Sequence, residues 1–124
     1  MGINYCPYCK IDCVKLSTRK ELYRRLTIGK EFLDNNLHRK ISIEEVSRIA
    51  SLSPHHFKRS FKNLFGDSPH NYHVKIRLEY SRQLIEVGGS SVSEICQLVG
   101  FEDSSSFIRL FKINYGCTPG NLSR

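Results

Sequence analysis

The chain contains no long apolar run and no recognisable export signal. None of its 124 residues belongs to a stretch that approaches the roughly 18 consecutive apolar residues of a membrane-spanning helix. The sequence does not open with the basic start, short apolar segment and small-residue cleavage site of a signal peptide. We therefore expect a protein of the cytoplasm that has no membrane partner.

Acidic residues are scarce relative to basic ones. Twelve Asp and Glu stand against nineteen Lys and Arg, which gives a net charge of +7 and an isoelectric point near 9.3. A chain with this balance favours a polyanionic partner. Residues 1–40 carry nine of the basic residues and four of the acidic ones, so charge alone does not show which part of the chain binds such a partner.

The sequence also lacks the residue groupings of common catalytic sites. It has no paired carboxylates for acid–base chemistry, no Ser–His–Asp set and no glycine-rich phosphate loop. The adjacent His55 and His56 do not have the H-E-x-x-H spacing of a zinc hydrolase. We therefore expect that the protein is not an enzyme and that its only candidate cofactor is the metal ion discussed next.

The five cysteines are odd in number, which argues against a disulfide framework. Three of them form a C-x2-C-x3-C cluster, namely Cys6, Cys9 and Cys13. Thiolates this close can share one zinc ion, but zinc usually takes four ligands. Asp12, His38 or a second chain would have to complete the set. Otherwise residues 1–17 are a cysteine-rich linker. The C-x-x-C part resembles a redox site, but no strand–helix–strand pattern surrounds it.

Two segments in the rest of the chain are copies of each other, residues 42–69 and residues 91–119. Matching positions are 49 apart in the first part of each copy and 50 apart in the remainder, so one extra residue lies between Phe101 and Phe107, where a turn can absorb it. Each copy reads as a short helix, a turn and a longer helix, which is the helix-turn-helix pattern.

A support helix is predicted before the first copy. Thr18 and Glu21 form a capping box, and apolar residues then recur at helical spacing until about Asn35. Together with the first copy, this helix makes a first unit of residues 18–67.

Each copy has the same capping and core pattern. Ser42 and Ser91 cap the short helices, Ser53 caps the longer helix of the first copy, and Asp103 or Ser104 caps that of the second. The apolar positions expected to face the core are Val46, Ile49, Ala50, Phe57, Phe61, Leu64 and Phe65 in the first copy, and Ile95, Leu98, Val99, Phe107, Leu110, Phe111 and Tyr115 in the second. The second copy makes a second unit of residues 90–124.

A long linker helix is predicted between the copies, over residues 68–89. Ser68 caps it, Pro69 opens it, and the glycine pair at 88–89 ends it. The helix is apolar on two sides, with Tyr72, Ile76, Tyr80, Leu84 and Val87 on one and Val74, Leu78 and Ile85 on the other. Such a helix is suited to a position between two small units.

The outward faces of the two longer helices differ. In the first copy this face consists of His55, Lys58, Arg59 and Lys62, with no acidic residue in the helix. In the second copy the matching residues are Ser105, Ile108, Arg109 and Lys112, with Ser104 beside them. A basic stripe on the second helix of a helix-turn-helix fits the major groove of DNA.

The matching arginines suggest a division of roles. Because Arg59 and Arg109 correspond while their neighbours differ, we predict that both hold phosphates and that the differing residues read bases. The readers would be His55 and Lys58 in the first copy, and Ser105 and Ile108 in the second. Ser104 either contacts DNA or caps its helix. Two unlike faces predict an asymmetric DNA site read by one chain.

The second copy carries an extended signature, namely Ile95, Val99, Gly100, Phe101, Asp103, Ser105, Phe107, Arg109, Phe111, Lys112, Gly116 and Pro119. Residues 77–85 precede it with the pattern R-L-x-x-S-x-x-L-I. On these residues the chain from about Leu22 to Arg124 resembles the AraC/XylS family of bacterial transcription regulators. The resemblance implies an all-α fold of about seven helices, with two homeodomain-like helix-turn-helix subdomains joined by the linker helix. It also implies binding to promoter DNA, with RNA polymerase recruited or blocked.

The chain departs from the family pattern at several positions. Ser47 and Cys96 replace a small alanine in the two short helices, and Ser51 replaces the turn glycine of the first copy, which predicts a looser turn there. The family's separate ligand-binding domain has no counterpart, so we expect either a stand-alone regulator or an excised DNA-binding domain.

The leading hypothesis is a sequence-specific regulator that binds double-stranded promoter DNA as a monomer, in two successive major grooves. The alternative is a metal- or thiol-responsive sensor that uses the cysteine cluster and has DNA binding as its output. A third reading, a basic helical protein-interaction module, predicts no DNA binding at moderate salt.

Overall fold

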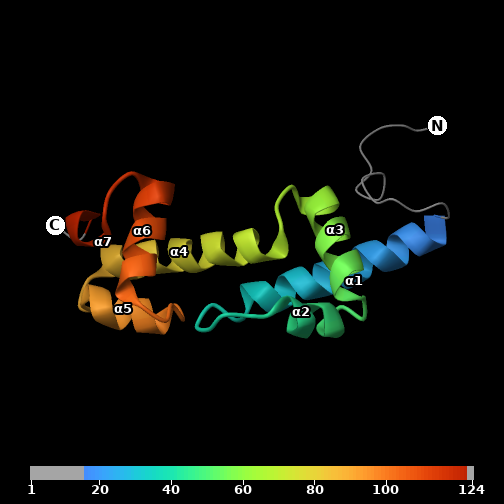
Figure 1. Cartoon of the computed structure of the whole chain (residues 1–124), viewed down its shortest axis with the longest axis horizontal. Helices are drawn as coiled ribbons and strands as arrows, with labels where there is room; N and C mark the ends of the chain where they lie inside the picture. The colour runs from blue at the N-terminus through green and yellow to red at the C-terminus, as the bar shows by residue number, and fades with distance from the viewer. Residues whose placement is uncertain (1–15, 123–124) are drawn as a thin grey trace. The chain divides into compact units, whose positions relative to one another are not determined.

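The described part of the chain, residues 16–122 of a computed structural model, contains helices and no strand (Figure 1). The helices are α1 (Leu16–Asp34), α2 (Ile43–Ile49), α3 (Pro54–Phe65), α4 (Pro69–Val87), α5 (Val92–Leu98), α6 (Ser104–Tyr115) and α7 (Pro119–Leu122). The prediction of an all-α fold with about seven helices is confirmed. No helix in the described range is both long enough and apolar enough to cross a membrane.

The described chain divides into two compact units. Unit 1 holds residues 16–35 and 41–72, and unit 2 holds residues 36–40 and 73–122. The linker helix α4 is therefore shared, because its first turn belongs to unit 1 and the remainder to unit 2. The short loop after α1 also belongs to unit 2.

The internal duplication includes the helix before each copy. α1 and α4 each have 19 residues, α2 and α5 each have 7, and α3 and α6 each have 12. Leu26 and Leu33 of α1 precede Leu78 and Ile85 of α4 by 52 positions, and all four side chains are buried. Each unit is therefore built on the same three-helix plan, which the sequence pattern alone did not reveal.

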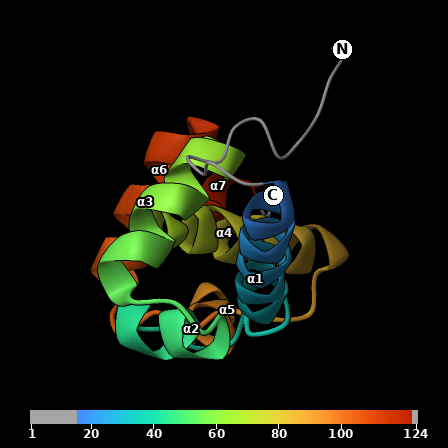
Figure 2. The ribbon, with the colours of Figure 1, turned by 90° about the vertical axis from the view of Figure 1, so that its right-hand side faces the viewer.

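In unit 1, helices α1, α2 and α3 pack against one another (Figure 2), and two phenylalanines of α3 are buried in this unit. Phe57 and Phe61 are completely buried, and their rings are tilted by 44° with centroids 5.4 Å apart. A Cβ at Gly29 of α1 would lie 2.5 Å from Cε1 of Phe57. Glycine at this position therefore lets α1 approach the aromatic core of α3 more closely than any side chain would allow.

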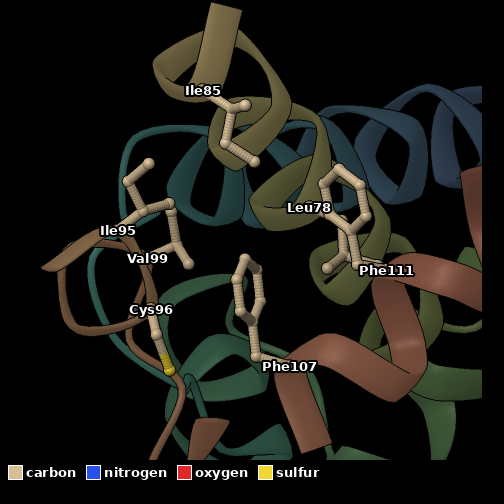
Figure 3. Packing of buried hydrophobic residues seen from close by; sticks show 7 residues of the cluster. All are labelled: Leu78, Ile85, Ile95, Cys96, Val99, Phe107 and Phe111. Carbon is tan, nitrogen blue, oxygen red and sulfur yellow. The ribbon is translucent and has the colours of Figure 1, made fainter. Parts of the chain in front are cut away.

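In unit 2, one buried cluster joins α4, α5 and α6 (Figure 3). Its members are Leu78 and Ile85 of α4, Ile95 and Cys96 of α5, Val99 just after α5, and Phe107 and Phe111 of α6. The ring of Phe107 extends from α6 into the middle of this cluster. Removal of these apolar side chains from water is the main contribution that favours folding of such a small unit.

The helix ends are capped largely as the sequence predicts. The Ser53 hydroxyl accepts from the His56 backbone amide at 3.2 Å, and Ser68 accepts from the amide of Asn71 at 3.2 Å. At the other ends of α3 and α6, Gly66 and Gly116 adopt φ values of 84° and 78°. This left-handed conformation favours glycine and stops both helices after 12 residues.

The predicted capping box at Thr18 is wrong. Helix α1 includes Leu16, so Thr18 lies within the helix and not before it. The Glu21 carboxylate does not serve the helix start, because it accepts from Arg24 at 2.6 Å and from Arg25 at 2.8 Å. These side chains lie three and four positions later on the same helical face.

Three apolar residues are exposed instead of packed: two that were assigned to the core of the copies and one that was placed on an apolar side of the linker helix. Ile49 is 43% exposed, Leu98 is 48% exposed and Val87 is 83% exposed. In α2 and α5 the buried face is centred on a small residue, Ser47 or Cys96, which is almost completely buried. Because the buried face is centred on these residues, the matching positions 49 and 98 lie at its edge, where solvent reaches them. Val87 is the last residue of α4 and lies beyond its buried stripe.

Candidate nucleic-acid interface

Helix α3 presents the four residues predicted for its outward face on the surface. His55, Lys58, Arg59 and Lys62 are all exposed, whereas Phe57 on the opposite side is fully buried. The helix contains no acidic residue, so no carboxylate on α3 offsets the positive charge of this face. The arrangement gives one cationic stripe about two turns long on a helix that is anchored by its aromatic side.

Helix α6 presents a face of different chemistry. Its outward residues Ser104, Ser105, Ile108, Arg109 and Lys112 are all exposed, and Phe107 and Phe111 lie on the buried side. Ile108 is 36% exposed and occupies the position that Lys58 occupies in α3. An exposed apolar side chain between polar and basic ones can contact the methyl group of thymine in the major groove.

The cap of α6 is Asp103 and not Ser104. The Asp103 carboxylate accepts from the backbone amide of Ser106 at 2.7 Å and from its hydroxyl at 3.3 Å. Asp103 therefore serves the amide three residues later, as Ser53 does at the start of α3. Neither Ser104 nor Ser105 acts as the N-cap, and both stand on the exposed first turn of α6.

The turns that lead into α3 and α6 have the same backbone conformation. Ser51 adopts φ 60° and Gly100 adopts φ 75°, both left-handed. Each turn is closed by the same two backbone hydrogen bonds. In the first, the amide of Ser51 or Gly100 donates to the carbonyl three residues earlier. In the second, the amide of Leu52 donates to the Ser47 carbonyl at 2.9 Å, or that of Phe101 to the Cys96 carbonyl at 3.1 Å. The looser turn predicted for Ser51 is therefore wrong, because its serine accepts the left-handed conformation. The extra residue of the second copy is Glu102, which precedes the cap.

An arginine from α4 is buried against the second turn. Arg77 is 3% exposed, and its Nε donates to the carbonyl oxygen of Val99 at 2.8 Å. Its guanidinium carbon lies 4.3 Å from the centroid of the Phe101 ring, a cation–π contact. Burial lowers the pKa of Arg77 from its usual range. Sequence reasoning missed this role, although Arg77 stands in the R-L pattern and four positions before buried Ser81.

Arg25 of α1 makes the corresponding contact in unit 1. Its Nη1 donates to the carbonyl oxygen of Ser51 at 3.2 Å, and its Nε donates to Glu21 at 2.8 Å. The side chain is 37% exposed, so this contact is more accessible to water than that of Arg77.

The loop of residues 36–40 lies against the same turn of unit 2. Nε2 of buried His73 is 2.8 Å from the carbonyl oxygen of Asn36. A Cβ at Gly100 would lie 2.5 Å from the Cα of Arg39. The turn before α6 is thus in contact with α4 on one side and with this loop on another.

The predicted zinc ligands Cys6, Cys9 and Cys13 lie outside the described residues, so the zinc hypothesis stays a prediction. Within residues 16–122 no cluster of three or more His, Cys, Asp or Glu side chains could hold a metal ion. The buried Cys96 thiol donates weakly to the Phe101 carbonyl at 3.7 Å, and burial raises the pKa of this thiol. Cys96 therefore packs as a small apolar residue.

The arrangement is that of known DNA-binding regulators. Residues 46–124 match a family model described as a helix-turn-helix domain. The chain is 36% identical over 88 residues to the probable transcriptional regulator LumQ of Photobacterium leiognathi, which covers 71% of this chain and 36% of LumQ. A crystal structure from Chromobacterium violaceum, described as an AraC-type DNA-binding domain-containing transcriptional regulator, superposes with a TM-score of 0.76. The chain belongs to the AraC/XylS family.

Further relatives of this AraC/XylS-family chain span a range of regulators. The MmsAB operon regulatory protein of Pseudomonas aeruginosa is 31% identical over 88 residues, or 71% of this chain and 29% of that protein. The bifunctional transcriptional activator/DNA repair enzyme AdaA of Bacillus subtilis is 29% identical over 92 residues, or 74% of this chain and 44% of AdaA. The chain therefore spans less than half the length of these curated relatives.

Solved structures of the family establish the fold of the domain. The Chromobacterium violaceum structure is 23% identical and covers 82% of this chain and 90% of its own. The DNA-binding domain of AdpA, solved in complex with a target DNA, gives a TM-score of 0.76 at 23% identity and covers 80% of this chain and 89% of its own. The tandem helix-turn-helix fold expected from the sequence is confirmed.

Proposed function

We propose that the chain regulates transcription by binding a specific double-stranded promoter site through α3 and α6. The observation that carries the proposal is the pair of matched, exposed faces on these helices, each placed after the same turn and backed by two buried phenylalanines. In a helix-turn-helix motif the second helix, here α3 or α6, enters the major groove.

The site read by these helices should be asymmetric, and one chain should read it in two successive major grooves. This part of the proposal rests on the unlike chemistry of the two faces. His55 and Lys58 offer an imidazole and a cation, while Ser105 and Ile108 offer a hydroxyl and apolar surface. Two identical half-sites would suit two identical readers, and the chain does not carry them.

Selection of binding sites from random duplex DNA tests the proposal. We expect an asymmetric consensus with two conserved blocks about one helical turn apart. A short palindrome would contradict the one-chain reading and indicate a dimer. Recovery of no consensus, with equal binding to all duplexes, would contradict sequence-specific function altogether.

The salt dependence of binding identifies the face that is used. The cations that can displace the counterions condensed on the DNA are Lys58, Arg59, Lys62, Arg109 and Lys112. If roughly 5–8 phosphate contacts form, the logarithm of the affinity should fall with the logarithm of salt concentration at a slope of roughly −4 to −7. A slope near zero would show that these cations do not face the DNA. Failure to bind at moderate salt would favour the protein-interaction module.

We further propose that the bound chain recruits or blocks RNA polymerase. It acts in the cytoplasm, where bacterial chromosomal DNA lies, and it catalyses no reaction. Transcription in vitro from a promoter that contains the selected site should rise or fall when the chain is added. A chain that binds the site but leaves transcript levels unchanged would need a further domain or partner. Chemical change in the bound duplex would contradict the non-catalytic role; the name of the relative AdaA includes a DNA repair activity.

A further inference from the structure

We infer that Arg25 and Arg77 are equivalent positioning residues, each of which fixes the turn that leads into the outward-facing helix of its unit. The effect on the two turns is independent of what the chain binds. The consequence for DNA binding rests on the proposed function.

The equivalence follows from the three-helix plan shared by the units. Arg77 follows Arg25 by 52 positions, the same distance that separates the completely buried Leu78 from Leu26. Both arginines therefore occupy the position just before the central core leucine of the first helix. From that position each side chain reaches a carbonyl oxygen at the turn of its own unit, at Ser51 or Val99.

The surroundings of Arg77 show that the turn is what the side chain binds. A buried guanidinium normally pairs with a carboxylate, because an uncompensated buried charge is costly. The contacts of Arg77 are instead the Val99 carbonyl oxygen at 2.8 Å and the Phe101 ring at 4.3 Å. These two groups lie on either side of Gly100, so one planar side chain holds both ends of the turn.

Arg25 uses the same principle with a different support. Its Nε is held by the Glu21 carboxylate at 2.8 Å, which leaves Nη1 to reach the Ser51 carbonyl at 3.2 Å. Ser51 is the only non-glycine residue with positive φ among residues 16–122. A charged donor on its carbonyl oxygen stabilises a backbone conformation that a serine rarely adopts.

The turn matters because it sets where the outward-facing helix begins. In unit 2 only Glu102 and the cap Asp103 separate Phe101 from α6, and in unit 1 only Ser53 separates Leu52 from α3. A change in the conformation of this connecting turn therefore shifts the first residues of the helix. These residues include His55 in unit 1 and Ser105 in unit 2.

Hydrogen exchange of the amides that close the two turns tests the inference without DNA. The variants are Arg77→Met and Arg25→Met, because methionine retains an unbranched stem but not the charged donor. We expect Arg77→Met to speed exchange of the Phe101 amide about tenfold or more while the Leu52 amide is unaffected, and Arg25→Met to do the reverse. Global stability is not the readout, since an apolar replacement of a buried charge can be neutral.

Two arginines on the same helices serve as matched controls. Arg82 of α4 pairs with Glu79 and Glu86, and Arg24 of α1 pairs with Glu21. Neither arginine contacts a turn, and Arg24→Met leaves the Glu21 carboxylate in place to hold Arg25. Arg82→Met and Arg24→Met should therefore leave both amides at wild-type rates. The inference is overturned if the exchange rate of each turn amide rises no more when its own arginine is replaced than when the control arginine is replaced. It is also overturned if Arg77→Met speeds both turns equally. Should Arg77→Met fail to fold, Arg25→Met decides alone.

Footprinting on the selected DNA site then tests the consequence for binding. We expect Arg77→Met to require about tenfold more protein to protect the half-site read by α6 while protection of the other half-site is retained, and Arg25→Met to show the converse. If the wild-type chain protects no site, the proposed function fails, and the exchange measurement still judges the positioning role. Faster exchange at the turns with unchanged half-site protection would overturn the inferred link to DNA.

Discussion

Gly100 and the backbone of Arg39 are in such close contact that a Cβ on Gly100 would lie 2.5 Å from the Cα of Arg39. Gly100 also adopts φ 75°, where side chains are disfavoured. We predict that Gly100→Ala destabilises unit 2 by about 3 kcal/mol or more, because left-handed strain and overpacking against backbone combine. Urea denaturation monitored by circular dichroism would measure the loss.

The control for this prediction is Gly116 in the same unit. It has a similar φ of 78°, but an added Cβ there would meet no atom within 4 Å. Gly116→Ala should therefore cost only the conformational part, about 1–2 kcal/mol. Equal losses in the two variants would show that the loop of residues 36–40 does not lie against Gly100 in solution.

Ser51 offers the opposite experiment, because its positive φ of 60° suits glycine better than serine. We predict that Ser51→Gly stabilises unit 1 by about 0.5–1 kcal/mol, since relief of left-handed strain exceeds the added flexibility of the unfolded chain. The urea midpoint should rise while the dependence on urea concentration stays unchanged. A lower midpoint would mean that the serine hydroxyl contributes more than the strain removes.

The pH dependence of unit 2 should include an acid titration at Glu79. The Arg82 guanidinium, which bonds to this carboxylate, is the main cause that lowers the pKa of Glu79 from 4.5 to about 2. Because the folded pKa is depressed, the stabilisation is present above pH 4.5 and is lost as the pH falls toward about 2. Its size should be small, since solvent reaches both side chains, which are 31% and 42% exposed.

NMR titration of the side-chain carboxyl carbons measures this pKa directly. In Arg82→Gln the Glu79 pKa should return toward its ordinary value of 4.5. The Tyr115 hydroxyl donates to the same carboxylate at 3.0 Å, so Tyr115→Phe should produce a smaller rise. If Tyr115→Phe moved the pKa more than Arg82→Gln, the order of these two causes would be reversed.

Local sequence signals predicted much of this fold, and the errors at Ile49 and Leu98 share one cause. Phe57 and Phe61 were identified from spacing alone, because large aromatics at helical intervals have few alternatives to burial. Ile49 was misassigned because the small polar Ser47 occupies the centre of the buried face of α2. The spacing of apolar residues cannot predict a buried face that is centred on a small polar residue.

The burial of Arg77 could not be predicted in the same way. Its hydrogen-bond acceptor is a backbone carbonyl 22 positions later in the chain, and no side-chain pattern identifies such a partner. The outward faces of α3 and α6 were predicted because exposed residues are left over once the core is assigned. Their contacts with DNA remain predictions.

The zinc hypothesis makes a prediction that depends only on composition. If Cys6, Cys9 and Cys13 ligate zinc, the purified chain should contain about one zinc ion per chain, and Cys6→Ser or Cys9→Ser should abolish it. Cys117→Ser is the matched control, because Cys117 lies far from the cluster in sequence. A chain free of zinc, or one in which Cys117→Ser has the same effect, would contradict the metal-responsive form of the sensor alternative.

The division of roles between Arg109 and Lys58 can be separated by comparing cognate and random duplexes. Arg59 and Arg109 occupy matching, exposed positions on α3 and α6, which suits a contact common to both units. A phosphate contact is common to all sequences, so Arg109→Ala should weaken binding to both duplexes alike. Lys58 has no counterpart in α6, where Ile108 stands, so Lys58→Ala should cost about 1–3 kcal/mol more on the cognate duplex.

Arg59→Ala provides an internal check on the same assignment. If the two arginines play equivalent roles, Arg59→Ala should resemble Arg109→Ala in its equal effect on both duplexes, and each should reduce the salt slope by about 1. Ile108→Ala should resemble Lys58→Ala in losing discrimination, but it should leave the salt slope unchanged because it removes no charge. If Arg109→Ala costs much more on the cognate duplex while Lys58→Ala weakens both equally, the assigned roles are reversed. The arginines would then read guanine, and the neighbouring residues would hold the backbone.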